Sequence, residues 1–458
     1  MSGDETTTQS DAGRPEAADA LIRGATAADI ADSIRGLVER GHLVPGDPLP
    51  PVRSLAARQG INRNTAVAAY RRLARAGIVQ AQGRAGTRIA PRSHLPQEGY
   101  APSGALKDLG SGNPAPRFIP DPSLALGEAV GRPVLYGEPV VDANLEQWAR
   151  EWMRPDTPAP PRISVTSGAV DAIERLLAQV LERGDTVGLE DPCFLASIQT
   201  VRLAGYRPSP IAVDEEGMTV AGLREALEGG ARAIVCTPRA QNPTGASLSE
   251  ERATQLRAVL ADHPYVLVIE DDYYSLLARS PFRSIVGSAH KRWALVRSVS
   301  KFLGPDLCLA LVGSDAETAE RLALRLSPGT TWVSHLLQRI AYGLLSDGSS
   351  RDLIARAGLH YAERDAAAAQ QLRERGVAAE QRDGMSLWVP CGAPARTVAE
   401  HLMRRGWLAR TGEDFRIRAG GEPSEHLRLT VHDLEARELG ELAHDLREAI
   451  DDAVREAD

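Results

Sequence analysis

Short apolar runs alternate with amphipathic helical stretches through the middle of this 458-residue chain, and this alternation constrains the fold more than any other feature. The segments are ISVTSG with AVDAIERLLAQVLERG after it, then TVGLE, ARAIVCTP, YVLVIEDD and WALVRSVSK. Strands that alternate with helices form a mainly parallel sheet, and ligands bind beyond the carboxyl ends of its strands. The sequence therefore predicts an α/β domain with its site at that edge of the sheet.

Two groups of residues that follow these runs could hold a ligand. Residues 167–169 (SGA) open a helix, where main-chain amides attract an anion such as phosphate, although the same pattern also caps ordinary helices. Lys301 follows the run WALVRSVS, and lysine is scarce in this chain, since three lysines stand beside fifty arginines. A reaction that needs an amine nucleophile therefore has three candidates, which are Lys107, Lys291 and Lys301.

Three further positions suit a pyridine ring. An acid of the run 270–272 could pair with a protonated ring nitrogen, Asn242 in QNPTG could donate to a phenolate oxygen, and Phe194 in EDPCF could stack on the ring. Each also has an ordinary explanation, as an exposed strand end, an Asn-Pro turn and a core position. Together with the anion site and Lys301 they indicate pyridoxal phosphate, with the lysine forming a Schiff base and the acid keeping the ring nitrogen protonated.

The N-terminal part of the chain has a different character. Residues 1–20 carry scarcely any large apolar side chain, so we expect a disordered tail. Residues 21–92 hold twelve arginines, no lysine and four acids, a charge of +8 in a chain whose net charge is −8. Apolar periodicity predicts three helices that end near glycines 41, 60 and 77, and then two short strands in IVQAQGRAGTRIA. This order is typical of a winged helix-turn-helix, and its charge favours double-stranded DNA as a partner.

Several side chains of this segment are of the kinds that contact bases and phosphates, although they could also form a solvated surface. The candidates are Arg53 on the second helix, Arg63, Asn64 and Thr65 at the start of the third helix, and Arg84 on the wing. The run GHLVPGDPLPPVRSLAARQGINRNTAVAAYRRLARAGIVQAQGRAGT resembles the GntR-type winged helix, in which the PPVR arginine and the NRNT residues face DNA. The resemblance implies that role for the same residues here and adds Gly86.

The remaining composition sets the boundaries and excludes some classes. Residues 93–107 contain Pro, Gly and Ser without periodicity and are expected to form a linker, with the large domain at residues 108–458. The four cysteines lie far apart without metal-ligand spacing, so neither a disulfide nor a metal site is expected. Because the chain lacks a signal-peptide pattern and an apolar run of bilayer length, we expect a cytoplasmic protein that does not bind membranes.

Eight ordered motifs within residues 108–458 are similar to those of fold-type I aminotransferases: SGNP, YGEP, TSGA, EDPCF, QNPTG, IEDDYY, SVSK and HLRL. The resemblance implies a mainly parallel sheet with a smaller C-terminal α+β subdomain. It implies that Lys301 is the catalytic residue and carries the internal aldimine, and that Asp271 pairs with the ring nitrogen. It further implies that Arg428 receives a substrate carboxylate, and that Tyr136 reaches the cofactor phosphate of the partner in a homodimer. The other cofactor positions that it implies are Ser167, Gly168, Ala169, Ser298 and Ser300 around the phosphate, Phe194 on the ring face, and Asn242 and Tyr273 at the ring oxygen.

One position departs from this pattern. Relatives commonly read SxSKxxxPxxR, with the arginine on the cofactor phosphate, whereas SVSKFLGPDLC places Cys308 there. Loss of a charged hydrogen-bond partner costs about 1.5–3 kcal/mol, roughly one to two decades in cofactor affinity. Another arginine could supply the missing charge, so the sequence leaves both outcomes open.

A GntR-type winged helix joined to an aminotransferase-like domain resembles the MocR family of bacterial transcriptional regulators. The resemblance implies a regulator that binds DNA and senses pyridoxal phosphate, an amine or an amino acid by aldimine exchange at Lys301. A change in domain closure would then reposition the DNA-binding arms. Two alternatives stay open, a working aminotransferase with an accessory DNA-binding domain and a cofactor-free domain that only dimerises.

Overall fold

The chain forms two compact units, Met1–Pro96 and Gln97–Asp458, in a computed structural model. The structure describes residues 21–44, 46–75, 78–81, 86–89, 106–326, 332–417 and 422–457. The predicted tail, Arg84 and residues 93–105 of the predicted linker lie outside these ranges. Within them, no helix has both the length and the apolar character needed to cross a bilayer.

Among its described residues, the smaller unit has three helices and a two-stranded antiparallel sheet, which is the winged helix predicted from the sequence. Its elements are α2 (Ala27–Glu39), α3 (Val52–Gln59), α4 (Arg63–Arg75), β1 (Val79–Ala81) and β2 (Thr87–Ile89). Thr26 begins α2 with a capping box, because its hydroxyl accepts from the Asp29 amide and the Asp29 carboxylate accepts from the Thr26 amide. Apolar residues from the helices and both strands then form one core, which includes Ile30, Ile34, Leu37, Leu55, Ala66, Leu73, Val79 and Ile89.

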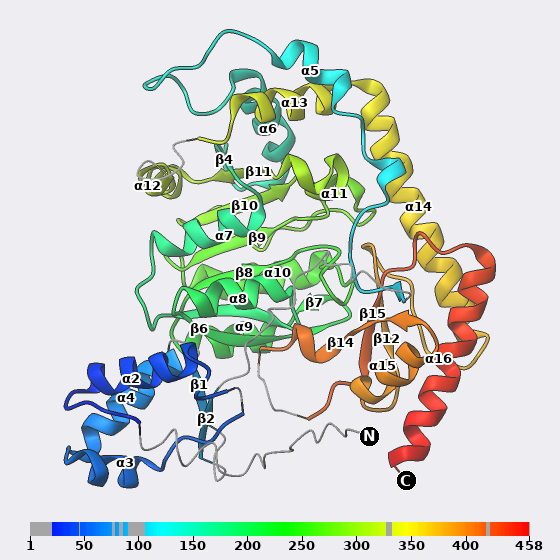
Figure 1. The fold of residues 1–458 in the computed structure, drawn as a ribbon. Coiled ribbons are helices and arrows are strands. Elements are labelled where there is room, and N and C mark those ends of the chain that lie inside the picture. The colour runs from blue at the N-terminus through cyan, green and yellow to red at the C-terminus, as the bar shows by residue number, and fades with distance from the viewer. Residues whose placement is uncertain are drawn as a thin grey trace, which may run out of the picture. The chain divides into compact units, whose positions relative to one another are not determined.

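An eight-stranded sheet with the strand order β4-β11-β10-β9-β8-β5-β6-β7 forms the centre of the larger unit (Figure 1). Its strands are β4 (Arg162–Thr166), β5 (Thr186–Asp191), β6 (Arg207–Asp214), β7 (Gly217–Met218), β8 (Ala231–Cys236), β9 (Leu267–Asp271), β10 (Trp293–Ser298) and β11 (Ala310–Ser314). The strands from β10 to β6 pair in parallel, whereas β11 is antiparallel to both of its neighbours. The carboxyl ends of the parallel strands therefore meet at one edge of the sheet.

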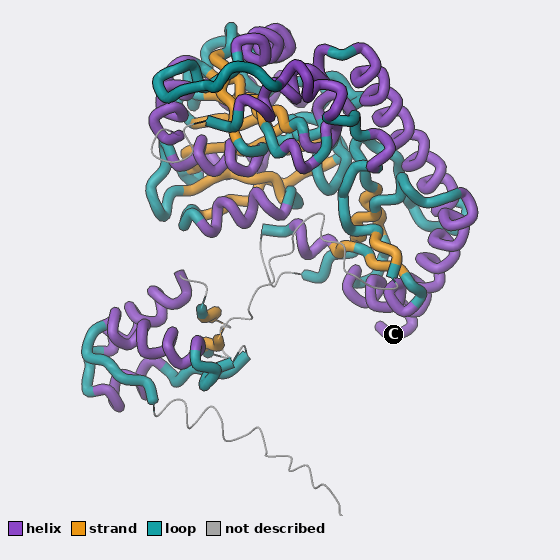
Figure 2. Tube along the Cα trace, turned by 45° about the horizontal axis from the view of Figure 1, so that its top comes forward, coloured by secondary structure: helices purple, strands orange, loops and turns teal. Residues whose placement is uncertain are grey.

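Helices cover both faces of this sheet (Figure 2). Because side chains alternate along a strand, Leu295 and Val296 of β10 belong to different apolar clusters, one packed under α6 and α13 and the other under α7 and α8. The helices of this part are α5 (Ser123–Ala129), α6 (Ala143–Met153), α7 (Ala169–Ala178), α8 (Leu195–Leu203), α9 (Val220–Glu228), α10 (Glu250–Ala261), α11 (Ser300–Leu303), α12 (Ala316–Leu326) and α13 (His335–Ser346).

A smaller α+β subdomain follows, as predicted, and the long helix α14 (Gly348–Arg373) runs to it from the large sheet (Figure 1). Its three-stranded sheet has the order β12-β15-β14, and the separate strand β13 pairs in parallel with β3 near the start of the unit. The remaining elements are β3 (Lys107–Asp108), β12 (Leu387–Pro390), α15 (Ala395–Arg404), β13 (Trp407–Leu408), β14 (Arg410–Thr411), β15 (His426–Leu429) and α16 (Ala436–Ala457).

Candidate functional site

A cavity of about 260 Å³ lies at the carboxyl edge of the parallel strands. Segments that follow β4, β5, β8, β9 and β10 all contribute to its wall, which is why residues distant in sequence meet there. The structure brings together every predicted cofactor position except Tyr136. The lining residues are Ser167, Gly168, Ala169, Val170, Ile173, Phe194, Thr237, Asn242, Asp271, Tyr273, Ser298, Ser300, Lys301 and Cys308.

One end of the cavity is built to hold an anion. Gly168 adopts a positive φ of 90° directly before α7, a conformation that favours glycine, and this turn places the start of the helix at the cavity wall. Ser298 ends β10, and its hydroxyl accepts from the Ser300 amide at 3.2 Å. Hydroxyls and a helix N-terminus are therefore available to a phosphate group.

An acid that the sequence reasoning missed also lies beside this end. The Asp171 carboxylate accepts from the Ser167 amide at 3.1 Å and forms an ion pair with Arg175, whose Nε lies 2.6 Å from its second oxygen. An aspartate in the first turn of the helix after SGA was the available signal, because such residues commonly accept from free first-turn amides. Asp171 places negative charge, partly neutralised by Arg175, close to the anion end.

Cys308 lies at the same end. It is exposed, and its thiol donates to the Ser167 carbonyl, with the sulfur 3.6 Å from that oxygen. Among the described residues that line the cavity, none is an arginine and Lys301 is the sole lysine. Of the two outcomes that the sequence left open, the described wall therefore favours a phosphate site that lacks a guanidinium.

Asp271 also lines the cavity. Its side chain is buried at the end of β9, and its Oδ1 accepts a hydrogen bond from no described residue. Burial, together with the smaller effect of the negative charge of Asp272, raises the pKa of Asp271 to about 7. A buried carboxylate oxygen without such a partner fits a positively charged donor, and the protonated nitrogen of a pyridine ring is one.

Asp272, the next residue, has the opposite surroundings. Its two oxygens accept from Arg239 at 2.8 Å each, and one of them also accepts from Arg297 Nε at 2.8 Å. Burial opposes its ionisation, but the hydrogen bonds and charges of the two arginines outweigh burial and hold the pKa of Asp272 below its usual value. Asp272 is therefore an ionised member of a buried ion-pair cluster.

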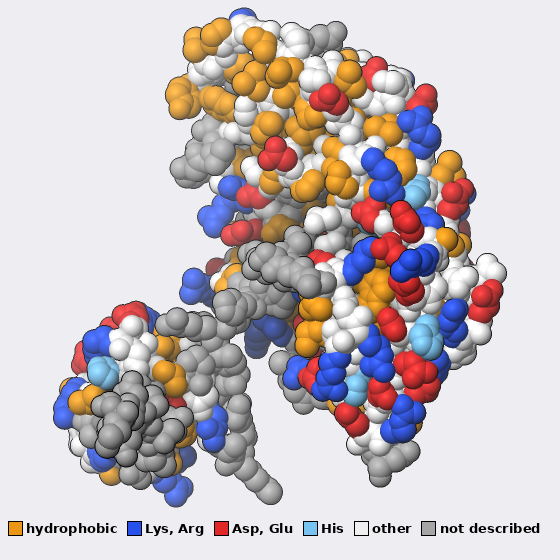
Figure 3. Space-filling view, turned by 45° about the vertical axis from the view of Figure 1, so that its right-hand side comes forward, with side chains coloured by type: hydrophobic (Ala, Val, Ile, Leu, Met, Phe, Trp, Pro, Cys, Tyr) orange, Lys and Arg blue, Asp and Glu red, His pale blue; other side chains and the backbone are white. Residues whose placement is uncertain are grey.

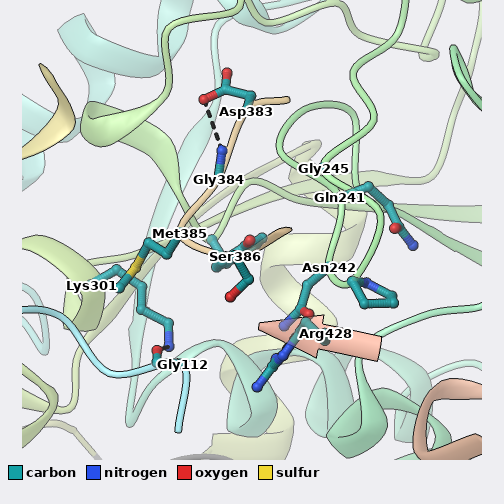
Figure 4. A pocket seen from close by; sticks show the side chains of 12 residues that line it. Gly112, Gln241, Asn242, Gly245, Lys301, Asp383, Gly384, Met385, Ser386 and Arg428 are labelled. Carbon is teal, nitrogen blue, oxygen red and sulfur yellow. Dashed lines mark hydrogen bonds between the residues drawn. The ribbon is translucent and has the colours of Figure 1, made fainter. Parts of the chain in front are cut away.

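A second, smaller cavity of about 20 Å³ shares Lys301, Tyr273 and Asn242 with the first and is also lined by Arg428 (Figure 4). Lys301 Nζ donates to the Gly112 carbonyl at 2.7 Å. Arg428 is buried, and its guanidinium donates to Asn242 Oδ1 at 3.1 Å. The predicted amine and the predicted carboxylate-binding arginine thus face the same space.

Two other predicted residues have simple positions. The Tyr273 hydroxyl donates to the Ala240 carbonyl at 2.8 Å, beside both cavities. Tyr136 is 88% exposed, and its ring centroid lies 5.3 Å from that of Trp332. Within one chain Tyr136 therefore contacts Trp332 and is absent from the described residues that line the cavity.

The predicted DNA-facing residues of the smaller unit lie at its surface. Arg53 on α3 and Arg63 and Asn64 on α4 are exposed, and Thr65 is half-buried. Gly86 is exposed just before β2, whereas Arg84 lies outside the described residues. The start of α4 thus presents polar side chains to solvent.

Comparisons with known proteins agree with this architecture. Residues 128–446 match the family "Aminotransferase class I and II", and residues 26–89 match "Bacterial regulatory proteins, gntR family". The chain is 45% identical to the vitamin B6 salvage pathway transcriptional repressor PtsJ of Salmonella typhimurium, over 94% of this chain and 100% of that protein. It is 29% identical to the pyridoxine biosynthesis transcriptional regulator PdxR of Corynebacterium glutamicum, over 64% of this chain and 67% of that protein.

A solved structure shows the same fold. LysN, the alpha-aminoadipate aminotransferase of Thermus thermophilus, aligns with a TM-score of 0.67 and 23% identity over 77% of this chain and 93% of its own. The larger unit is thus the pyridoxal phosphate domain of its family. The anion end of the cavity, the Lys301 amine and the Asp271 carboxylate fit this cofactor. With a GntR-type winged helix before that domain, the chain belongs to the MocR family of transcriptional regulators.

Proposed function

We propose that this chain is a transcriptional repressor of vitamin B6 genes that binds double-stranded DNA through its winged helix and responds to pyridoxal phosphate held at Lys301. One observation carries the proposal: a single cavity places Lys301 and the buried acid Asp271 beside an anion-binding helix start. The likeness to the repressor PtsJ, which extends over the whole of that protein, supports the choice of regulated genes.

Seven residues of the cavity have roles in this proposal. When bound, the cofactor supplies an aldehyde that reacts with amines and a ring that withdraws electrons. Lys301 provides the amine, and Asp271 becomes ionised as it accepts a hydrogen bond from the protonated ring nitrogen. Tyr273 and Asn242 orient the ring through its oxygen. The hydroxyls of Ser167, Ser298 and Ser300 and the start of α7 hold the phosphate.

DNA binding is assigned to the start of α4 and its surroundings. Arg53, Arg63 and Asn64 are exposed in a segment, residues 21–92, whose charge is +8. Arginine contacts to phosphates release counterions, so the affinity should fall steeply as salt increases. The negative charge of the rest of the chain leaves this segment as the natural contact for DNA.

A homodimer is part of the same proposal. Hydrophobic side chains gather on the end of the larger unit that carries α5 and α13 (Figure 3). Large exposed apolar patches on a folded domain mark interaction surfaces. Tyr136 is 88% exposed and is available to a second copy of this chain. The large apolar residues that are exposed on α5, between α5 and α6, and on α13 include Leu124, Leu126, Val130, Leu135, Tyr136 and Leu336.

The test combines visible absorbance with DNA binding by the full chain. Pyridoxal phosphate should give an absorbance band that borohydride fixes to Lys301. It should also change the affinity for the DNA upstream of the vitamin B6 genes of the same organism, which fluorescence anisotropy measures. Lys301→Ala should bind DNA without responding to the cofactor, whereas the matched variant Lys291→Ala, at an exposed position, should respond normally. Cofactor attached to Lys107 or Lys291, or a DNA affinity that ignores the cofactor, would refute the proposal.

Arg63→Ala separates the two halves of the proposal. It should weaken DNA binding by about 1–3 kcal/mol if Arg63 contacts a base, while cofactor binding stays unchanged. An unchanged DNA affinity in a correctly folded variant would remove Arg63 from the interface.

A second candidate function, transamination, is favoured by Arg428, which lines the same small cavity as Lys301. An arginine at that place suits the carboxylate of an amino acid. Incubation of the cofactor-loaded protein with amino acids should yield keto acid if this candidate is correct. A regulator without turnover should yield none above the level of Lys301→Ala.

A further inference from the structure

The segment that enters the larger unit, residues 107–115, passes between the large sheet and the C-terminal strands (Figure 1). We call it the strap. At its start, the amides of Lys107 and Leu109 donate to carbonyls beside and within β13 at 2.8 Å, and Leu109 is buried in the core of the small subdomain. At its end, Ala115 is buried in the large core, and its amide donates to the Tyr361 hydroxyl at 3.1 Å. The strap therefore joins two cores.

Between these anchors, two strap carbonyls accept from the two cations of the candidate site. The Gly112 carbonyl accepts from Lys301 Nζ at 2.7 Å, and Figure 4 shows the two groups side by side. The Gly110 carbonyl accepts from Arg428 Nη2 at 2.7 Å and from Arg410 Nε at 3.1 Å. Gly112 has a positive φ of 61°, which favours glycine and sets the direction of the backbone at this point.

These contacts compete with ligands for the same donors. When an aldehyde condenses with Lys301, Nζ forms a double bond to the aldehyde carbon. The Lys301 ammonium first gives one proton to solvent, and the two protons of the resulting neutral amine leave with the aldehyde oxygen as water, so the neutral imine nitrogen offers no N–H group to Gly112. A carboxylate bound at Arg428 would likewise compete with the Gly110 carbonyl for the Arg428 Nη2 group.

We propose that the strap transmits occupancy of the site toward the DNA-binding unit, because ligands displace its carbonyls from Lys301 and Arg428. This rests on the function proposed above. The chain order supports it, since Lys107 directly follows residues 93–106 of the predicted linker, and these follow the winged helix. Because the strap continues directly from the linker, a movement of the strap acts on the end of the linker that joins the larger unit.

Hydrogen exchange on the full chain tests the proposal. Saturating pyridoxal phosphate should increase exchange of the amides of residues 107–112 several-fold, while the buried strand β8 stays unchanged. Lys301→Ala should show the higher exchange before any cofactor is added and should not respond to it. Cofactor binding seen by absorbance, together with unchanged strap exchange, would refute the strap and leave the proposed function standing. Wild-type protein that binds no cofactor would refute both.

The strap also predicts an effect on affinity. Gly112→Ala should disfavour the left-handed backbone that holds the carbonyl on Lys301, so pyridoxal phosphate should bind up to roughly tenfold more tightly. The matched variant is Gly184→Ala, which has a positive φ of 96° and nothing within 4 Å of its added methyl group. Its cofactor affinity should equal that of wild type. Unchanged or weaker binding by Gly112→Ala would overturn the competition between strap and ligand.

Discussion

Asp271 and Asp272 are successive residues at the end of one strand, yet their surroundings differ completely. Asp272 accepts hydrogen bonds from Arg239 and Arg297, and its pKa lies below the usual value. Asp271 lies on the cavity side, where its Oδ1 accepts from no described residue and its pKa is raised to about 7. Alternation of side chains along the strand produces the difference. One carboxylate is satisfied by the protein, and the other is prepared for a ligand.

Because of this difference, Asp272 should contribute to the stability of the protein and Asp271 to ligand binding. A buried charge with its partners in place is costly to disrupt, because removal of one partner leaves the others buried and uncompensated. A buried carboxylate that lacks a described partner reduces the stability of the cofactor-free protein, and a positively charged ligand recovers that energy. Substitutions at the two positions should therefore affect different measurements.

The largest effect is expected at the ion-pair cluster. Asp272→Asn should lower the free energy of unfolding by about 3–5 kcal/mol, because Arg297, which is 1% exposed, and Arg239 lose a shared counter-charge. Denaturant unfolding of the cofactor-free protein measures it. Asp271→Asn is the matched control and should be no less stable than wild type. Equal losses in the two variants would mean that both carboxylates are structural.

At Asp271 the expected effect is on the cofactor. Asp271→Asn should weaken pyridoxal phosphate binding by about 1.5–3 kcal/mol, roughly one to two decades, because the ring nitrogen loses its charged acceptor. Equilibrium dialysis measures the dissociation constant, and the position of the visible band reports the protonation of the ring. Full affinity with an unshifted band would separate Asp271 from the ring nitrogen.

Cys308 extends the comparison to the anion end, where the described cavity wall contains no arginine. Cys308→Arg should tighten pyridoxal phosphate binding by a similar one to two decades, since a guanidinium would meet the phosphate. Cysteine already adopts the left-handed conformation here, with a φ of 37°, so arginine adds no new backbone strain. Tight binding by wild type that the substitution fails to improve would show that Cys308 does not limit the affinity.

The sequence predicted the parts of this site that depend on local order. Residues at the ends of parallel strands must meet at one edge, so strand order was enough to place the acid run 270–272 there, whereas the choice of Asp271 and Ser298 came from the family resemblance. Asp272 was indistinguishable from Asp271 by type, and its partner Arg239 lies 33 residues away, a distance that no local pattern encodes.

The same reason explains why the strap was missed. SGNP was recognised as a motif, but the contact of Gly112 with Lys301 spans 189 residues and uses a main-chain carbonyl, which has no residue type. Asp171 was overlooked because an acid in a first helical turn has an ordinary capping explanation.

The most direct test of the comparison is the pH dependence of stability, in which the expected change is small per pH unit and accumulates over the range. Because the pKa of Asp271 rises from 3.8 to about 7 on folding, the unfolded chain releases a proton in this range that the folded cofactor-free protein keeps. The stability that Asp271 contributes is complete below pH 3.8 and is lost as the pH rises to about 7. Asp271→Asn should therefore reduce the slope of unfolding free energy against pH by one proton, about 1.4 kcal/mol per pH unit. The Asp272→Asn variant should show the same slope over a narrower pH range. It lacks the negative charge of Asp272, which helps to raise the pKa of Asp271. Parallel curves for wild type and Asp271→Asn would mean that the two carboxylates are equally well satisfied.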